Sequence, residues 1–183
     1  REVKAAQVDL ADELFAESIP VPEIQSVLTH INNDLYRRII EKNLDDMVQN
    51  GWGEPPVAFC VIVMGSGGRG ESYLYPDQDN GFILDDYPDS RHNEIDRFFI
   101  ELAMRMTDDL DKVGIPLCKG HVMATNPVWR KTASQWREQI SLWCRRQSLV
   151  ALRFSDIFFD FRPVYGEVDL AAALREDISR TVK

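Results

Sequence analysis

The chain has 183 residues, 44% of them hydrophobic, which is enough to bury a core of its own in one domain. Its net charge of -9 disfavours a nucleic-acid partner, because the average field repels phosphate backbones, and no apolar run of about 18 residues predicts a membrane span. Three cysteines without a CxxC spacing and an N-terminus without a signal-peptide pattern predict a cytoplasmic protein with reduced thiols.

The first 50 residues are predicted to form an N-terminal helical extension. Apolar residues recur every three or four positions over 2–16 and again over 22–49, as on one face of a helix. The sequence GWGEPP at 51–56 cannot continue a helix, because it contains two prolines and two glycines. We therefore divide the chain into this extension, 1–50, and a second domain, 51–183. Helical sequence at both ends indicates a piece of a longer multidomain protein.

Strands and helices are predicted to alternate after that break. The apolar run VAFCVIVM has the length and composition of a central strand that is covered on both faces. The predicted elements are a strand at 57–64, a strand at 81–84, a helix from Ser90 as N-cap to Gly114, a helix over 131–147, a strand at 157–164 and a short helix from Val168. They predict an α/β fold in which a small mixed sheet is flanked by helices.

The glycine-rich segment from Gly65 to Gly70 has two interpretations. It fits GxGxxG directly after a strand, and Asp85 lies twenty residues beyond Gly65, as in a dinucleotide-binding fingerprint. That fold requires a crossover helix between its two strands, and Pro76 interrupts the short stretch that would have to form it. We therefore favour the other interpretation.

The other interpretation joins the turn at Gly65 and Ser66 to Asp77 and Asp79, which follow after ten residues and lead into an apolar strand. Side chains alternate along an extended segment, so both carboxylates point to one face and Gln78 points away. Paired carboxylate oxygens, completed by substrate phosphates, are ligands that suit Mg²⁺ or Mn²⁺. The pattern predicts a site for a divalent cation.

The glycine-rich turn is the candidate site for a nucleoside triphosphate. Backbone amides of Gly65, Ser66 and Gly67 could cradle the phosphates, because glycine allows a close approach. Arg69 supplies a positive charge that could pair with them. These four residues are our predicted nucleotide-binding residues.

If a hydroxyl group attacks a phosphate of the bound triphosphate, one cation would activate that hydroxyl while another holds the phosphates. Such a two-metal site usually needs a third carboxylate. Asp160 is the candidate, as catalytic residue and metal ligand, because it is an acid among apolar neighbours in the predicted strand 157–164. A surface pair of Asp160 with Arg162 on an edge strand is the structural alternative. Asp156 is a weaker candidate.

Several segments together resemble nucleotidyltransferases of the DNA polymerase beta superfamily, in particular those related to bacterial PII uridylyltransferase and glutamine synthetase adenylyltransferase. The resemblance extends over about 24–174. The segments are MGSGGRGE at 64–71, DQDN at 77–80, CKGHVMA at 118–124, NPVWR at 126–130 and FDFRPVYG at 159–166. The chain departs from the superfamily at Gln78, where a hydrophobic residue is common; this polar side chain could face a ligand or water.

This resemblance implies a polymerase beta-like fold and a magnesium-dependent transfer of a nucleoside monophosphate from a nucleoside triphosphate to a hydroxyl of a protein or small-molecule acceptor. A regulatory, uridylyltransferase-like role in bacterial signalling is implied too. Relatives carry CBS or cyclic-nucleotide-binding sensor domains before this domain and a helical domain after it, so we expect such flanking domains, missing from this piece, in the longer protein.

Two other functions fit the residues. The first is a catalytically silent regulatory module that binds a nucleotide and is coupled to sensor domains. The second is a purely structural interaction domain, which would bind no nucleotide. A zinc site at Cys118 and His121 lacks a second pair of ligands, so packing is the preferred role for both.

Overall fold

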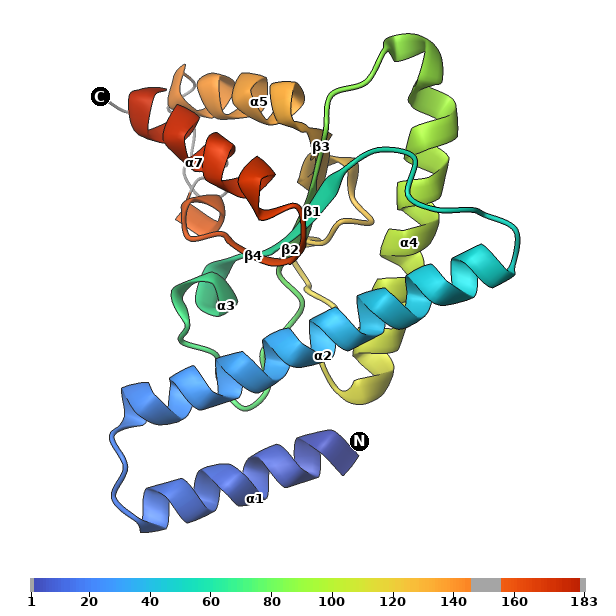
Figure 1. The fold of residues 1–183 in the computed structure, drawn as a ribbon. Helices are drawn as coiled ribbons and strands as arrows, with labels where there is room; N and C mark the ends of the chain where they lie inside the picture. The colour runs from blue at the N-terminus through green and yellow to red at the C-terminus, as the bar shows by residue number, and fades with distance from the viewer. Residues whose placement is uncertain (1, 146–155, 182–183) are drawn as a thin grey trace.

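The computed structural model describes residues 2–145 and 156–181 (Figure 1). In chain order the elements are α1 (Glu2–Ala16), α2 (Val21–Gln49), β1 (Phe59–Val63), α3 (Gly65–Arg69), β2 (Asn80–Leu84), η1 (Asp89–Arg91), α4 (His92–Val113), η2 (Pro127–Trp129), β3 (Arg130–Thr132), α5 (Ala133–Arg145), β4 (Arg162–Gly166) and α7 (Val168–Thr181). The helices predicted over 2–16 and 22–49 are confirmed. The end of the helix predicted over 131–147 lies outside the described residues.

The four strands form one mixed sheet in the order β3-β2-β1-β4. β1 is antiparallel to both β2 and β4, whereas β2 and β3 are parallel. β1 is therefore a central strand, as its apolar sequence predicts. The mixed sheet with its flanking helices confirms the predicted α/β fold class.

Helices cover both faces of the sheet, as Figure 1 shows, with α2 and α4 on one side and α5 and α7 on the other. Side chains along β1 alternate between the two cores: Phe59, Val61 and Val63 pack towards α2 and α4, while Cys60 and Ile62 pack towards α5 and α7. Each large side chain buried in this way stabilises the fold by about 1.5–3 kcal/mol. The sequence VAFCVIVM is apolar throughout because both faces are covered.

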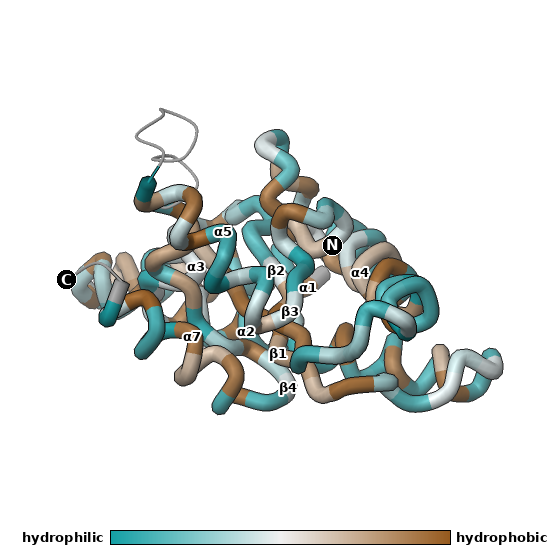
Figure 2. The backbone as a smooth tube through the Cα atoms, turned by 90° about the horizontal axis from the view of Figure 1, so that it is seen from above, coloured by the Kyte–Doolittle hydropathy of each residue, from teal (hydrophilic) through white to brown (hydrophobic). Residues whose placement is uncertain are grey.

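α4 is an amphipathic helix, and the colour in Figure 2 alternates between brown and teal along it. It ends where predicted, at Gly114, whose φ of 100° closes the helix through backbone bonds to Leu110 and Asp111. The predicted N-cap at Ser90 is wrong. The short helix η1 occupies that stretch, and Arg91 stands at the cap position without a capping side-chain bond.

The long helix α2 contributes to the same core as the sheet, through Tyr36, Ile39, Ile40 and Met47. α1 packs against α2 in a separate small cluster that contains Ala11. Because α2 shares its core with β1 and α4, its apolar face depends on the rest of the domain. The division of the chain at residue 50 stays a prediction.

The strand predicted at 157–164 is wrong in its first half. Residues 156–159 are helical, Asp160 forms a turn, and β4 begins only at Arg162. The aromatic run in this stretch packs as a helical turn, with Phe158 stacked on Trp136 of α5 at a centroid distance of 4.5 Å. A short apolar run does not distinguish a buried helical turn from a strand. The three-residue strand β3 was not predicted.

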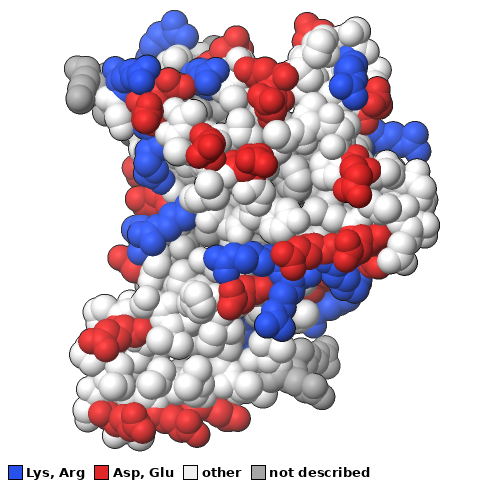
Figure 3. Space-filling model, viewed as in Figure 1, with Lys and Arg blue, Asp and Glu red and all other residues white. Residues whose placement is uncertain are grey.

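No helix within the described residues is long and apolar enough to cross a membrane. Charged side chains of both signs are spread over the face drawn in Figure 3. α1 carries exposed acids, among them Asp9, Asp12 and Glu13, and red side chains line the edge of the molecule where this helix lies. This outer edge repels anions.

Candidate functional site

The candidate site lies where β1 ends and β2 begins. Val63 and Asn80 are paired in the antiparallel register, and the Met64 N–H donates to the Asp79 carbonyl at 2.9 Å, which extends the ladder by one step. The glycine-rich segment after β1 and the DxD segment before β2 therefore leave the sheet at the same end. Their closeness follows from the strand pairing.

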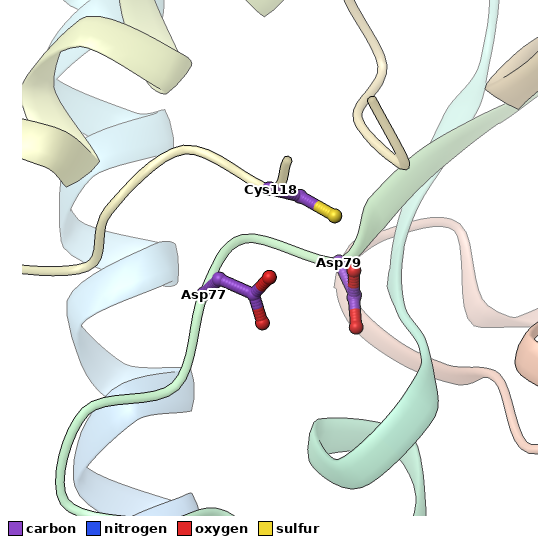
Figure 4. A group of neighbouring side chains, drawn as sticks. All are labelled: Asp77, Asp79 and Cys118. Carbon is purple, nitrogen blue, oxygen red and sulfur yellow. The ribbon is translucent and has the colours of Figure 1, made fainter. Parts of the chain in front are cut away.

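Figure 4 shows the side chains of Asp77, Asp79 and Cys118 converging on one space. One ligand atom from each residue lies within 4.8 Å of the others, so the three could share a metal ion. Asp77 is exposed, Asp79 is half-buried and Cys118 is buried. The expectation that both carboxylates point to one face is thus confirmed, whereas their role as metal ligands stays a prediction.

Gln78 points away from the two aspartates and into the protein. Its Nε2 donates to the carbonyls of Thr107 at 3.0 Å and Ile115 at 2.9 Å, and the residue is fully buried. The Gln78 N–H also donates to the Pro116 carbonyl at 2.9 Å. The suggestion that this polar residue faces a ligand or water is therefore wrong: it ties the DxD segment to the end of α4.

Cys118 was not predicted as a site residue. It lies about 40 positions after the aspartates, and no local spacing links it to them. The connection is tertiary, because Asn80 holds the segment that follows Cys118 by two hydrogen bonds. The Asn80 N–H donates to the Val122 carbonyl at 3.0 Å, and Asn80 Oδ1 accepts from the Ala124 N–H at 2.9 Å. Only the resemblance of 118–124 to a family segment pointed to this region.

Burial raises the pKa of Asp79 to about 6; the hydrogen bond from Cys118 lowers it, and the neighbouring charge of Asp77 raises it. Burial also raises the pKa of the Cys118 thiol to about 11. In the metal-free protein the thiol therefore stays protonated at neutral pH and donates a hydrogen bond to Asp79. The ligand atoms of Asp77 and Asp79 are hard carboxylate oxygens, which fit Mg²⁺ or Mn²⁺.

Gly65 brings the turn into direct contact with this carboxylate pair. Its φ of 56° is left-handed, and a Cβ at this position would lie 2.8 Å from Oδ2 of Asp79. A residue with a Cβ would be strained in this conformation and would displace the Asp79 carboxylate. The segment from Gly65 to Arg69 forms the short helix α3, where an open turn was expected. The first N–H groups of such a turn have no acceptor within the helix.

Asp160 lies against α3 at Gly68 and Arg69. Its carboxylate accepts from Arg69 Nη1 at 2.9 Å, while Arg69 Nε donates to Glu71 at 2.8 Å. A Cβ on Gly68 would overlap the Asp160 carbonyl oxygen, so the turn at 160 packs directly on α3. Among the described residues, Asp160 is not part of the group formed by Asp77, Asp79 and Cys118. Its role as a third ligand stays a prediction.

A pocket adjoins the carboxylates, between α2, α3 and the DxD segment. Its empty volume is about 350 Å³, including its opening to solvent. The residues that line it include Asn32, Tyr36, Ser66, Gly67, Asp77 and Asp79. Ser66 and Gly67, predicted to bind nucleotide, thus share a pocket wall with both aspartates. Burial raises the pKa of Tyr36, whose hydroxyl accepts from Asn80 Nδ2 at 3.3 Å.

Residues 5–149 match the model of a protein family described as "Putative nucleotidyltransferase DUF294". The match includes the glycine-rich segment, both aspartates and Cys118, while Asp160 lies beyond it. No curated protein matches the chain.

Proposed function

The chain belongs to this family of nucleotidyltransferases, and from that premise we propose that it transfers a nucleoside monophosphate from a nucleoside triphosphate to a hydroxyl group, with Asp77 and Asp79 binding Mg²⁺ or Mn²⁺. The convergence of these two carboxylates beside the glycine-rich segment is the observation that supports the proposal most strongly. Two neighbouring carboxylates that repel each other, one of them half-buried, cost stability, and a bound cation would offset that cost.

The proposed reaction forms one bond and breaks one. The acceptor oxygen bonds to the α-phosphorus, the bond between that phosphorus and the bridging oxygen breaks, and pyrophosphate leaves with the bonding electrons. The acceptor proton passes to a carboxylate or to water. A divalent cation supplies charge neutralisation for the phosphates and lowers the pKa of a hydroxyl that it binds.

The protein groups would hold the triphosphate in line for this attack. Gly65, Ser66 and Gly67 offer backbone N–H groups and a hydroxyl beside the carboxylates, where the outgoing phosphates would lie. Arg69 is exposed and could turn to a phosphate. It would then release Asp160, whose carboxylate would become free to accept the proton of the acceptor hydroxyl.

A protein or small molecule is the proposed acceptor. The net charge of -9 and the acidic edge along α1 oppose a nucleic acid. A uridylyltransferase-like, regulatory role is the finer proposal. The alternative function is a nucleotide-binding regulatory module without turnover, and the unpaired carboxylates beside the pocket are compatible with it.

The test is calorimetric titration of the chain with each of the four ribonucleoside triphosphates, with and without Mg²⁺. We expect binding that requires Mg²⁺, and we expect Asp77→Ala combined with Asp79→Ala to weaken it at least a hundredfold, because both cation ligands are removed. The control is Asp9→Ala combined with Asp12→Ala, which removes the same charge from the exposed face of α1.

Failure of all four triphosphates to bind would overturn the proposal and favour an interaction domain. If both double variants lose the same affinity for the triphosphate, the change in net charge alone would explain the loss at Asp77 and Asp79. Mg²⁺-dependent binding without pyrophosphate release, with hydroxyl acceptors supplied, would favour the regulatory module.

A further inference from the structure

Arg162, the first residue of β4, is an exposed cation at the end of the sheet where the candidate site lies. It is paired with Val63, the last residue of β1. Among the residues that the structure describes, its guanidinium has no partner in a hydrogen bond or an ion pair. The surface pair with Asp160 that the sequence allowed is not formed; Asp160 accepts from Arg69 instead, at 2.9 Å.

Two other arginines near this end of the sheet are already engaged. Arg37 of α2 is paired with Asp34 and donates to the Val164 carbonyl at 3.1 Å. Arg69 bridges two carboxylates. A triphosphate carries more negative charge than one divalent cation neutralises, so its binding calls for positive side chains as well. Arg162 can supply such a charge without first giving up a carboxylate.

The pairing of the strands places Arg162 on the same face as the pocket. Residues directly opposite each other on antiparallel strands point to one face, with Cβ atoms about 4.5–5.5 Å apart. Val63 points to the face covered by α2 and lines the pocket that Asp77 and Asp79 share. The Arg162 side chain therefore leaves the sheet on this face, one strand further out, where it is open to solvent.

The short helix α3 joins the carboxylate pair to the surroundings of Arg162. At its start, a Cβ on Gly65 would lie 2.8 Å from Oδ2 of Asp79. Two residues later, a Cβ on Gly67 would lie 3.8 Å from Cβ of Val63, which is the strand neighbour of Arg162. A triphosphate with its α-phosphate at the aspartates and its outgoing phosphates beside Gly67 would come within reach of the Arg162 guanidinium.

We propose that Arg162 binds the outgoing phosphates of the nucleoside triphosphate, the part of the nucleotide that leaves as pyrophosphate. This inference rests on the proposed function. A guanidinium group is planar and offers several N–H donors, which suit two phosphate oxygens at once. Arg162 then distinguishes a triphosphate from a monophosphate, because the monophosphate has no group to place beside it.

The test is Arg162→Met, which removes the charge and keeps an unbranched side chain. Calorimetric titration with the tightest-binding ribonucleoside triphosphate and Mg²⁺ gives the affinity for the whole nucleotide. Displacement of that triphosphate by inorganic pyrophosphate, or by the matching monophosphate, gives the affinities for its two parts. We expect the variant to bind the triphosphate and pyrophosphate about tenfold more weakly, and the monophosphate within about twofold of the wild type.

The control is Arg145→Met, which removes the same charge from α5, on the opposite face of the sheet (Figure 1), and should leave all three affinities unchanged. Urea denaturation should give Arg162→Met the midpoint of the wild type, since its guanidinium has no partner to lose among the described residues. An unchanged affinity for pyrophosphate overturns the assignment, as does an equal loss for the monophosphate. If the wild type binds no triphosphate, the proposed function itself has failed; if it binds one and Arg162→Met binds it equally well, only this inference has.

Discussion

Two groups of charged side chains flank the same part of the sheet, and they differ in how their charges are balanced. Arg130 of β3 is buried, and its guanidinium donates to Asp96 at 2.9 Å and to the Ala124 carbonyl at 2.6 Å. Asp77 and Asp79 lie together before β2, and among the described residues no lysine or arginine is found in an ion pair with either. Both groups cost desolvation free energy, but only the first is compensated within the protein.

The difference teaches how to separate structure from function in this molecule. A buried charge with a complete set of partners holds elements together, here β3, α4 and the segment before η2. A half-buried charge that faces another of the same sign lowers stability unless something binds. Arg130 belongs to the first kind.

The largest expected change in stability comes from removing Arg130 from its hydrogen bonds with Asp96 and the Ala124 carbonyl. Arg130→Met leaves Asp96 and the Ala124 carbonyl without their partner, and we expect a loss of about 3–5 kcal/mol in the free energy of unfolding, measured by urea denaturation. Lys131→Met, at the neighbouring half-buried position, is the control and should change it by less than about 1 kcal/mol. A similar small loss for both variants would show that the Arg130 pair contributes little.

At Asp77 and Asp79 we expect a smaller change in the free energy of unfolding, and one of opposite sign. Asp79→Asn removes the buried charge and its repulsion from Asp77, so we expect the metal-free protein to gain about 1–2 kcal/mol at pH 7, after discounting for partial solvation. It should also lose its Mg²⁺-dependent nucleotide binding. Such a gain is typical of residues kept for function.

The pH dependence of this gain follows from the raised pKa of Asp79. The folded protein holds the proton up to about pH 6, whereas the unfolded chain releases it near the usual 3.8. Wild-type stability therefore falls as pH rises between these values, and Asp79→Asn should escape that part of the fall. Urea denaturation without divalent cations should show no difference below about pH 4 and the full difference above pH 6. A variant less stable than wild type at pH 7 would contradict this reasoning.

The smallest effect on stability is expected at Arg69. Its pairs with Glu71 and Asp160 join side chains that are 38–54% exposed, so Arg69→Met should change the free energy of unfolding by less than about 1 kcal/mol. If Arg69 binds phosphate, the affinity for triphosphate should fall roughly tenfold. Arg91→Met, which breaks an exposed pair with Glu94, should match it in stability and leave affinity unchanged. Equal affinities of the two variants would remove Arg69 from the site.

Much of the fold could be predicted because its signals are local. The period of α2 and α4, the uniform apolar run of β1 and the glycine at the end of α4 each reflect the geometry of one element. The stretch from 157 to 164 could not be assigned, because its aromatic residues pack equally well from a helical turn, and contact with Trp136 decides between the two.

By itself, the sequence determined the fold class and the pairing of Asp77 with Asp79. Side chains alternate along an extended segment, so two residues that are two positions apart point to the same face. Tertiary structure alone decided that Gln78 joins the DxD segment to the end of α4 and that Cys118 donates a hydrogen bond to Asp79. Asp160 shows the same limit, because its neighbour Arg69 comes from a distant segment. These relations join residues far apart in the chain, and their distances depend on how helices pack on the sheet, which no local pattern encodes.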